Sequence, residues 1–313
     1  MDTVVLGRTG IDVSVAGLGC GGHSRLGQSY GATRAASVDL VRRALDLGIT
    51  YVDTAQAYGT EGIVGEAVAN RRDGVVISSK TSPRSRDGAL FDAAALRAAV
   101  EESLVTLDTD CVDVYHLHGV ADDEYDHCVK ELVPELLRLR DAGAIRFLAI
   151  SERFAADPGH VMLQRAVADD CWDVMMVGFN LLNQSARDRV FTATREQDIG
   201  IEVMFAVRRA LSREDELTRI VQQLVAEGRV DAGDIDLDEP LEFLVHDAGA
   251  TSVVEAAYRF VRHEPGCHVV LTGTGNIDHL EENVRSIVAP ALPDDDLARV
   301  RNLFGHLDHL SGN

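Results

Sequence analysis

The chain lacks any uninterrupted apolar stretch of the ~18 residues that a membrane-spanning helix needs. Its amino terminus, MDTVVLGRTG, has no basic segment ahead of an apolar core, so the pattern of a secretory signal is missing as well. We therefore expect a cytoplasmic protein with no membrane partner.

Cysteine is sparse, and its spacing is irregular. The five cysteines in 313 residues show no paired spacing, which is typical of reduced cytosolic thiols rather than of a disulfide framework or a zinc site. The tripeptide HLH places His116 and His118 on the same face of a strand, but no third ligand stands at a suitable spacing. We expect no bound metal.

Positive charge is also in deficit. Thirty Lys and Arg residues stand against 51 Asp and Glu residues, which gives a formal net charge of −21. Because binding to nucleic-acid phosphates needs a basic face, this balance argues against a nucleic acid as partner. An anionic ligand would have to be held by local donors against an unfavourable average field.

Short strand-like runs alternate with helix-like segments at a period near thirty residues. The expected strands are 14–20, 49–53, 74–80, 111–118, 145–150, 172–178, 201–207 and 267–273. The expected helices between and after them are 34–47, 61–71, 92–107, 127–142, 158–169, 183–198, 251–264 and 277–288. Continuous Val/Ile runs separated by helices indicate a parallel sheet covered by helices. Eight such units favour an α/β protein with a closed (β/α)8 TIM barrel over an open doubly wound sheet.

Three segments fall outside this repeat. Residues 3–15 predict a β-hairpin that turns at GRTG, and residues 294–310 predict a C-terminal helix. The loop after the seventh strand, about 208–248, is unusually long; it holds a helix-like stretch at 213–227, and we interpret it as a lid. No low-complexity linker divides the chain, so residues 1–313 are expected to form a single domain.

Polar side chains stand at the ends of three consecutive strands. Asp53 ends the second strand, with Tyr58 in the loop beyond it; Lys80 ends the third strand and His118 the fourth. Each has an ordinary structural explanation on its own, as a cap, a loop aromatic, a surface charge or a core histidine. Because the chemistry of such barrels lies at the carboxyl ends of the strands, their coincidence predicts one site.

The chemistry of this set is that of a proton donor. A free tyrosine has a pKa near ~10, and an adjacent ammonium group favours the phenolate. Asp53 would keep Lys80 charged in a partly buried place, and His118 could hydrogen-bond a carbonyl oxygen and orient it. Such a site would protonate an alkoxide as it forms, but it does not identify the source of the electrons.

The segments that carry these residues resemble the aldo-keto reductase family. The resemblance lies in GITYVDTAQAYGTEGIVGEAV, VVISSKTS, VDVYHLHG and VVLTGTGNIDHLEENV, and it extends over essentially the whole chain. It implies a (β/α)8 barrel closed at its bottom by the hairpin. It also implies NAD(P)-dependent interconversion of an aldehyde or ketone and the alcohol by direct hydride transfer. The family's catalytic residues fall on Asp53, Tyr58, Lys80 and His118, with Tyr58 as acid in reduction and base in oxidation.

The resemblance assigns residues to the nicotinamide half of the cofactor. Ser151 corresponds to a serine that holds the carboxamide, and Phe179 to the aromatic beneath the nicotinamide ring. Glu152 stands where the family has an asparagine, and Met176 where it has a glutamine. The full set of implied cofactor-binding residues is Gly19, Cys20, Gly21, Asp53, Ser151, Glu152, Phe179, Arg208, Gly273, Thr274, Gly275, His279, Glu282 and Asn283.

The phosphates and the adenine are assigned to later segments. Arg208 and Arg209 are the predicted contacts of the pyrophosphate, and they could equally be surface arginines. The glycine-rich TGTGN before a helix presents backbone N–H groups to a phosphate. Glu282 and Asn283 match the residues that contact adenine.

The choice between NADP and NAD stays open in the sequence, with NADP slightly preferred. The family prior favours NADP. Basic residues that many relatives use for the 2′-phosphate are missing, and Gly273, Asn276 and His279 stand in their places. Losing arginine there removes charge-assisted contacts and keeps NAD open.

Substrate contacts are expected on the loops at the same rim. The expected substrate-facing residues are His23, Arg25, Tyr58 and His118, with Arg84 and Arg86 as weaker candidates. Aromatic residues make up only 5% of the chain, which favours a sugar or a small aldehyde over a hydrophobic ketone. The alternatives are an NAD-dependent sugar dehydrogenase that works oxidatively and a nicotinamide-binding regulatory subunit with little turnover. The sequence makes no prediction of oligomeric state.

Overall fold

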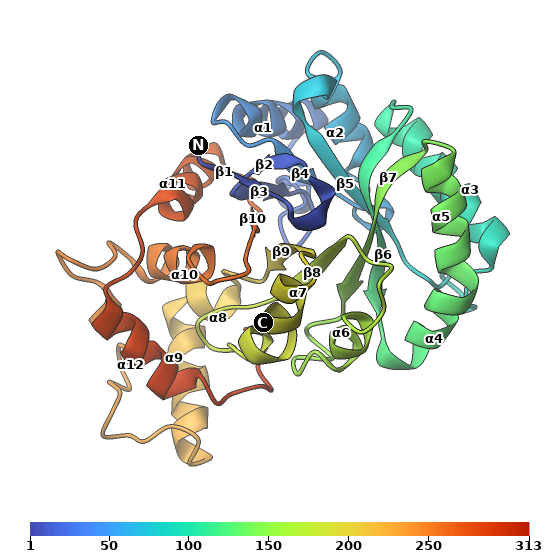
Figure 1. Ribbon diagram of the computed structural model, residues 1–313. Coiled ribbons are helices and arrows are strands. Elements are labelled where there is room, and N and C mark those ends of the chain that lie inside the picture. Colours follow the sequence, from blue (N-terminus) through green and yellow to red (C-terminus); the bar gives the residue numbers. More distant parts are fainter. Residues whose placement is uncertain (313) are drawn as a thin grey trace.

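The computed structural model describes residues 1–312, and its centre is a closed barrel of parallel strands (Figure 1). The strands are hydrogen-bonded in the order β10-β3-β4-β5-β6-β7-β8-β9, which closes the sheet on itself. Their bounds are β3 (Ala16–Gly19), β4 (Tyr51–Asp53), β5 (Val76–Thr81), β6 (Val112–Val120), β7 (Ile145–Glu152), β8 (Val174–Gly178), β9 (Gly200–Met204) and β10 (Val269–Thr272). The predicted (β/α)8 TIM barrel is confirmed.

A β-hairpin covers the amino-terminal end of the barrel, as predicted. Strands β1 (Thr3–Val5) and β2 (Asp12–Ser14) pair antiparallel around the 3-10 turn η1 (Gly7–Thr9). Buried hairpin side chains join the lowest layer of the barrel interior, in a cluster that comprises Leu6, Val13, Tyr51, Val76, Val114, Ala149, Val174 and Val269. Arg8 Nη2 also donates a hydrogen bond of 3.1 Å to the carbonyl oxygen of Trp172, a fully buried residue just before β8.

Helices surround the barrel (Figure 1). They are α1 (Arg34–Asp46), α2 (Glu61–Val68), α3 (Ala93–Leu107), α4 (Tyr125–His127), α5 (Val133–Asp141), α6 (Val161–Ala166), α7 (Thr192–Glu196), α10 (Val253–Arg262), α11 (Ile277–Val288) and α12 (Asp294–Phe304). A π-helical turn, η6 (Cys128–Leu132), joins α4 to α5, and another, η7 (Arg187–Phe191), precedes α7. No helix within residues 1–312 is long and apolar enough to cross a bilayer.

Helix α6 is shorter than the predicted helix over 158–169. The backbone of His160 takes a left-handed conformation, with φ of 59°, so the helix begins only after it. The Asp157 carboxylate accepts hydrogen bonds of 2.9 Å from Val161 N and 3.0 Å from Met162 N, which satisfies donors of the first turn. The cap therefore lies further from the first helical residue than the sequence pattern indicates.

The long segment after β9 is mostly ordered. It contains α8 (Arg209–Ser212), α9 (Glu214–Ala226) and the 3-10 turn η8 (Glu242–Leu244). Helix α12 covers part of it, since the guanidinium of Arg299 lies 4.0 Å from the centroid of the Phe243 ring. The predicted C-terminal helix is confirmed, whereas the lid role of this segment and the single domain stay predictions.

Candidate active site

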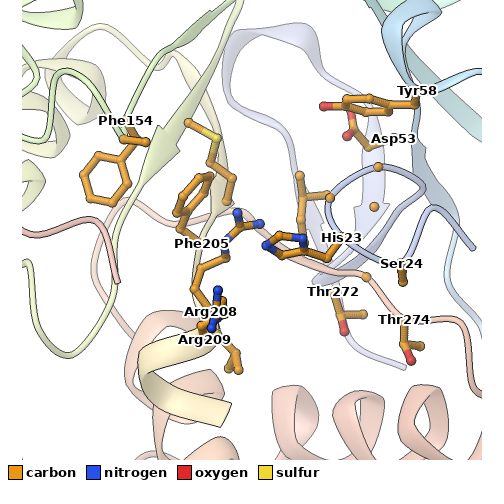
Figure 2. Close-up of a pocket in the computed structure, with 18 of the residues that line it drawn as sticks. His23, Ser24, Asp53, Tyr58, Phe154, Phe205, Arg208, Arg209, Thr272 and Thr274 are labelled. Carbon is orange, nitrogen blue, oxygen red and sulfur yellow. The ribbon is translucent and has the colours of Figure 1, made fainter. Parts of the chain in front are cut away.

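The carboxyl ends of the strands open into a cavity of about 1290 Å³. Figure 2 shows Tyr58 and Asp53 on one side of this cavity and Phe154 and Phe205 on the other. The sequence-predicted residues that line it are Gly19, Gly21, His23, Asp53, Tyr58, His118, Glu152, Met176, Arg208, Arg209, Gly273, Thr274, Gly275, Asn276 and His279. The cavity therefore brings together segments from both halves of the chain.

A buried ion pair lies at the base of the site. Lys80 Nζ contacts Asp53 Oδ1 and also donates a hydrogen bond of 2.7 Å to the carbonyl oxygen of Thr54. Ser78 Oγ donates to the same Asp53 oxygen at 2.9 Å. Both charged side chains are almost completely buried. Burial alone would disfavour the ammonium, but Asp53 outweighs it and keeps the pKa of Lys80 above its ordinary value.

The phenol and the imidazole lie beside this pair. Tyr58 belongs to the 3-10 turn η3 (Gln56–Tyr58), and its hydroxyl is 3.3 Å from His118 Nε2. Lys80 Nζ is 5.2 Å from the centroid of the Tyr58 ring. Gly21 gives this ring its room, because a Cβ there would lie 2.5 Å from Tyr58 Cε2. The structure thus gathers all four residues that the sequence placed at strand ends.

The protonation states follow from burial and charge. Burial, followed by the charge of Lys80, lowers the pKa of His118 to about 3, so its imidazole is neutral near pH 7. Burial raises the pKa of Tyr58 above its ordinary value, although Lys80 acts in the opposite direction. The sequence argument considered Lys80 alone; the structure shows that loss of hydration is the larger effect.

A second buried pair lies one layer below. His116 of β6 precedes His118 by one inward-facing position, and Glu202 of β9 faces it from across the barrel. His116 Nε2 and Glu202 Oε1 are 2.7 Å apart, and both side chains are 0% exposed. Glu202 was missed in the sequence, although a single acid within the apolar run IEVM was a usable signal. His116 belongs to this pair, and no group of three or more His, Cys, Asp or Glu residues within 1–312 could hold a metal.

The other end of the cavity suits an anion. Gly273, Thr274 and Gly275 precede α11, where the Asn276 side chain accepts hydrogen bonds of 2.7 Å from Asp278 N and 3.2 Å from His279 N. Arg208 and Arg209 line the same region, which Figure 2 shows beside Thr272 and Thr274. Backbone N–H groups at a helix start and guanidinium groups are suitable donors for phosphate. The residues present therefore fit the pyrophosphate of a dinucleotide.

A close glycine contact shapes this end. A Cβ on Gly275 would lie 2.4 Å from Gly27 Cα, so the loop after β3 lies directly against the loop before α11. Only a residue without a side chain fits at this crossing. The contact places His23 and Tyr30, which follow β3, along the same cavity.

Several predicted cofactor residues do not line the cavity. Cys20 is fully buried, and Glu282 is exposed on α11. Ser151 Oγ accepts a hydrogen bond of 2.8 Å from Gly119 N, and Asn283 Nδ2 donates one of 2.9 Å to Thr272 Oγ1. The side chains of Ser151 and Asn283 thus hold loop geometry, that of Cys20 packs in the core, and that of Glu282 faces solvent.

Arg25 and Phe179 also lie apart from the expected places. Arg25 Nε donates a hydrogen bond of 2.8 Å to the carbonyl oxygen of Tyr58, and its side chain does not line the cavity. Phe179 is fully buried in the core, where its ring stacks on Phe260 with centroids 5.5 Å apart and an interplanar angle of 9°. It cannot lie beneath a ring bound in the cavity.

Two other aromatic rings face the cavity instead. Phe205 directly follows β9 with a left-handed backbone, φ of 66°, and its ring meets that of Phe154 edge to face at 5.4 Å. Arg208 lies over Phe205, with its guanidinium 4.1 Å from the ring centroid. Both residues were missed in the sequence, where no local pattern marks either side chain as facing the cavity.

Glu152 lines the cavity but is already partnered. Its carboxylate lies 2.9 Å from His160 Nδ1 and accepts a hydrogen bond of 2.8 Å from Gly178 N. The His160 ring stacks on Phe154, with centroids 5.3 Å apart. The acid that replaces the family's asparagine is thus hydrogen-bonded to a buried histidine and to a backbone N–H group.

Comparison with known proteins agrees with this arrangement. Residues 18–304 match the model of the aldo/keto reductase family. An uncharacterized oxidoreductase, YqkF of Bacillus subtilis (strain 168), is 26% identical over 306 residues, which cover 95% of this chain and 94% of that protein. An L-galactose dehydrogenase of Arabidopsis thaliana is 34% identical over 153 residues, which cover 47% of each chain.

The fold has solved counterparts. The holo form of aldo-keto reductase AKR11C1 from Bacillus halodurans superimposes with a TM-score of 0.74 at 24% identity, covering 97% of this chain and 96% of the other. A putative aldo-keto reductase from Pseudomonas aeruginosa has a TM-score of 0.65 at 26% identity, covering 91% of this chain and 93% of the other.

Proposed function

Because this chain belongs to the aldo/keto reductase family and is an oxidoreductase of that family, we propose that it interconverts a small-molecule aldehyde or ketone and the corresponding alcohol, with Tyr58 as general acid and base. The observation that carries the proposal is the grouping of the Tyr58 hydroxyl and His118 Nε2, 3.3 Å apart, beside the buried Lys80–Asp53 pair. A module that only binds a nucleotide has no need for a buried ammonium next to a phenol.

The proton chemistry follows from these surroundings. A carbonyl oxygen held between Tyr58 and neutral His118 accepts a hydrogen bond from each donor. The raised pKa of Tyr58 keeps its proton in place at neutral pH, ready for an oxygen that becomes an alkoxide. Lys80 stabilises the phenolate that remains, and the same phenolate takes the proton back in oxidation.

The family uses nicotinamide cofactors, and the cofactor supplies the hydride in reduction and takes it up in oxidation. In our proposal the strand ends around Gly19 and Gly21 receive its nicotinamide half, and the loop 273–275 with Arg208 receives its phosphates. Phe205 replaces Phe179 as the proposed aromatic contact of the ring. These side chains orient the cofactor; the proton stays with Tyr58.

We propose NADP as the slightly preferred cofactor, with NAD as the alternative. Arg209 and His279 line the phosphate end and would favour an additional phosphate. Two contacts count against an additional phosphate. Arg209 Nη2 is already 3.0 Å from Glu216 Oε1, and the side-chain oxygen of Asn276 already accepts a hydrogen bond from the first turn of α11. The alternative, an NAD-dependent sugar dehydrogenase, is supported by the partial match to the plant L-galactose dehydrogenase.

The test combines binding with turnover. We expect fluorescence titration to detect binding of NADPH or NADH, and a panel of aldehydes and sugars to reveal turnover. Tyr58→Phe should abolish reduction and leave cofactor binding intact, because it removes only the proton donor. Tyr125→Phe is the matched control, since that phenol bonds to Asp169 outside the cavity.

Two results would contradict the proposal. Full activity of Tyr58→Phe would exclude the assigned acid. Tight cofactor binding without turnover of any compound in the panel would favour a nicotinamide-binding regulatory subunit instead.

A further inference from the structure

The rim beside Tyr58 and His118 carries a cluster of two arginines and one glutamate. Arg84 follows β5, Glu124 belongs to the 3-10 turn η5 (Asp122–Glu124) after β6, and Arg153 follows β7. Arg84 Nε contacts Glu124 Oε1, and Arg153 Nη2 lies 3.2 Å from both Glu124 oxygens. The Glu124 side chain is only 1% exposed. Two guanidinium charges thus share one carboxylate, which leaves a positive surplus.

The neighbouring acids are exposed, unlike Glu124. Asp122 and Asp126 share one guanidinium, that of Arg165, and the negative charge left over lies on side chains that are 48% and 87% exposed. Asp123 is exposed to solvent and has no ion pair within the described chain. Solvent screens an exposed carboxylate far more than it screens the buried Glu124.

Arg153 faces the cavity that contains the proton donor. It lines this cavity together with Gly119, the residue after His118, and its Nε donates to the Gly119 carbonyl oxygen. The Arg153 charge contributes to the low pKa of His118, after burial, Lys80 and His116. Its remaining nitrogen, Nη1, donates no hydrogen bond to any residue within 1–312.

The acids that line the cavity do not oppose an anion at this place. Asp53 is paired with Lys80, and Glu152 lies 2.9 Å from His160 Nδ1. The protein has a net charge of −21, so its average electrostatic field is unfavourable for an anion. Positively charged guanidinium groups beside the reacting groups oppose that field locally. Arg208 and Arg209 also line the cavity and belong to the proposed cofactor site, and Arg208 lies close enough to Tyr58 for the two groups to interact electrostatically.

We propose that Arg153 is a specificity-determining residue that binds an anionic group of the substrate, a carboxylate or a phosphate, while the substrate carbonyl lies at Tyr58 and His118. This inference rests on the proposed function and narrows its substrate to aldehydes or sugars that carry a negative charge. The guanidinium is held in advance by Glu124 and Gly119, so little side-chain entropy is lost on binding. A planar guanidinium also suits the oxygens of carboxylate and phosphate better than a lysine would.

The test compares charged and neutral substrates that share the same carbon chain. One pair is succinic semialdehyde and butanal, and the other is glyceraldehyde 3-phosphate and glyceraldehyde. In one of the two pairs, we expect the wild type to have a higher kcat/KM for the charged substrate than for the neutral one. The pair that shows this preference identifies the anionic group that Arg153 binds, a carboxylate or a phosphate. In Arg153→Gln the charged-to-neutral ratio should fall about tenfold to a hundredfold, the range for one lost hydrogen bond to a charged group. Arg153→Lys should keep part of the preference.

Arg84→Gln is the matched control. It removes a charge from the same carboxylate, but Arg84 does not line the cavity, so the ratio should change much less. If the charged-to-neutral ratio of kcat/KM is unchanged in Arg153→Gln for both pairs, the inference is overturned. Arg153 would then only connect its own loop to Gly119 and Glu124. An equal loss in Arg84→Gln would also overturn it, because the effect would then belong to the loops.

A binding measurement separates this inference from the proposed function. In the presence of saturating NADP(H), succinate or glycerol phosphate should raise the Tm of the wild type more than chloride does at equal ionic strength. In Arg153→Gln this additional rise should be absent. This shift is expected even if none of the four aldehydes is turned over, a result that would count against the proposed function alone. Equal shifts in the two proteins would overturn the anion site.

Discussion

The buried pair of His116 and Glu202 should stabilise the barrel only while both partners are present. Both side chains are 0% exposed, and Nε2 and Oε1 are 2.7 Å apart. Leaving one charge of such a pair without its partner costs about 3–5 kcal/mol. Because the whole free energy of unfolding of a domain is about 5–15 kcal/mol, either loss would be large.

The two single variants should differ in magnitude. His116→Leu leaves the Glu202 carboxylate unpaired, and we expect a loss of about 3–5 kcal/mol near pH 8. Glu202→Met leaves the His116 imidazole without its partner, and an unpaired buried polar group costs only about 1–3 kcal/mol. The double variant His116→Leu/Glu202→Met buries no charge, so its stability should lie within about 1 kcal/mol of the wild type or above it.

The stability of the His116→Leu variant should depend on pH, and the direction of this dependence follows from the pKa of Glu202. Burial works against the Glu202 carboxylate, but His116 outweighs it and holds the pKa of Glu202 below its ordinary value. Without His116 that pKa should rise above the unfolded value. The loss of stability in His116→Leu should then be smallest at a pH below the ordinary carboxyl pKa. It should grow as the pH rises from there through the raised pKa of Glu202 in the folded variant.

Urea unfolding followed by circular dichroism measures all four proteins at pH 5 and pH 8. The reasoning fails if the losses of the two single variants simply add in the double variant, because the two sites would then be energetically independent. It also fails if His116→Leu is less stable at pH 5 than at pH 8, relative to wild type.

Two further predictions concern the residues around Tyr58. Since the pKa of His118 is lowered to about 3, the folded protein keeps it neutral, and its contribution to stability should be present above the unfolded value of ~6.5 and be lost as the pH falls from there. His118→Asn should therefore flatten the decline of the urea midpoint between pH 7 and pH 4, with exposed His23→Asn as control; an identical slope in His118→Asn and wild type would refute the shift. Gly21→Ala places a Cβ 2.5 Å from Tyr58 Cε2 and must displace the ring, so kcat for reduction should fall by roughly tenfold or more, as expected for a misplaced acid. Gly74→Ala, an open position without a left-handed backbone, is its control, and wild-type activity of Gly21→Ala would show that the ring position is not critical.

The barrel and the residues at the strand ends were readable in the sequence. Parallel strands present their carboxyl ends at one rim, so Asp53, Lys80 and His118 could be placed together without knowledge of side-chain directions. Strand bounds were less exact: the run from residue 14 was taken as a barrel strand, but Ser14 pairs with Thr3 in the hairpin, and β3 begins at Ala16.

The aromatic wall of the cavity was not readable. Phe205 has a left-handed backbone that redirects its side chain, and no local pattern announces such a conformation in a phenylalanine. Phe154 fills space that Gly178 leaves open, since a Cβ there would lie 2.1 Å from the Phe154 ring. Phe179 was assigned from the family resemblance, but its ring stacks on Phe260 of α10 rather than facing the barrel interior.

The cross-barrel pair was hidden for a topological reason. Strands β6 and β9 are not neighbours in the sheet, so nothing in the register of adjacent strands relates His116 to Glu202. The cross-barrel contact depends on the closure of the barrel, which sequence periodicity predicts only as a class. Arg84, Glu124 and Arg153 follow the adjacent strands β5, β6 and β7, but they lie in the loops, where strand register no longer fixes side-chain positions.

The position of the chain's one tryptophan separates two optical signals. Trp172 is buried at the hairpin end of the barrel, where Arg8 contacts its carbonyl oxygen, whereas the ligand cavity opens at the other end. The fluorescence of Trp172 therefore reports whether the hairpin end of the barrel is folded. It is a poor indicator of whether the cavity holds a ligand. If a reduced dinucleotide binds in the cavity as proposed, its emission would report the opposite end, so one sample could be monitored for folding and for ligand at two wavelengths.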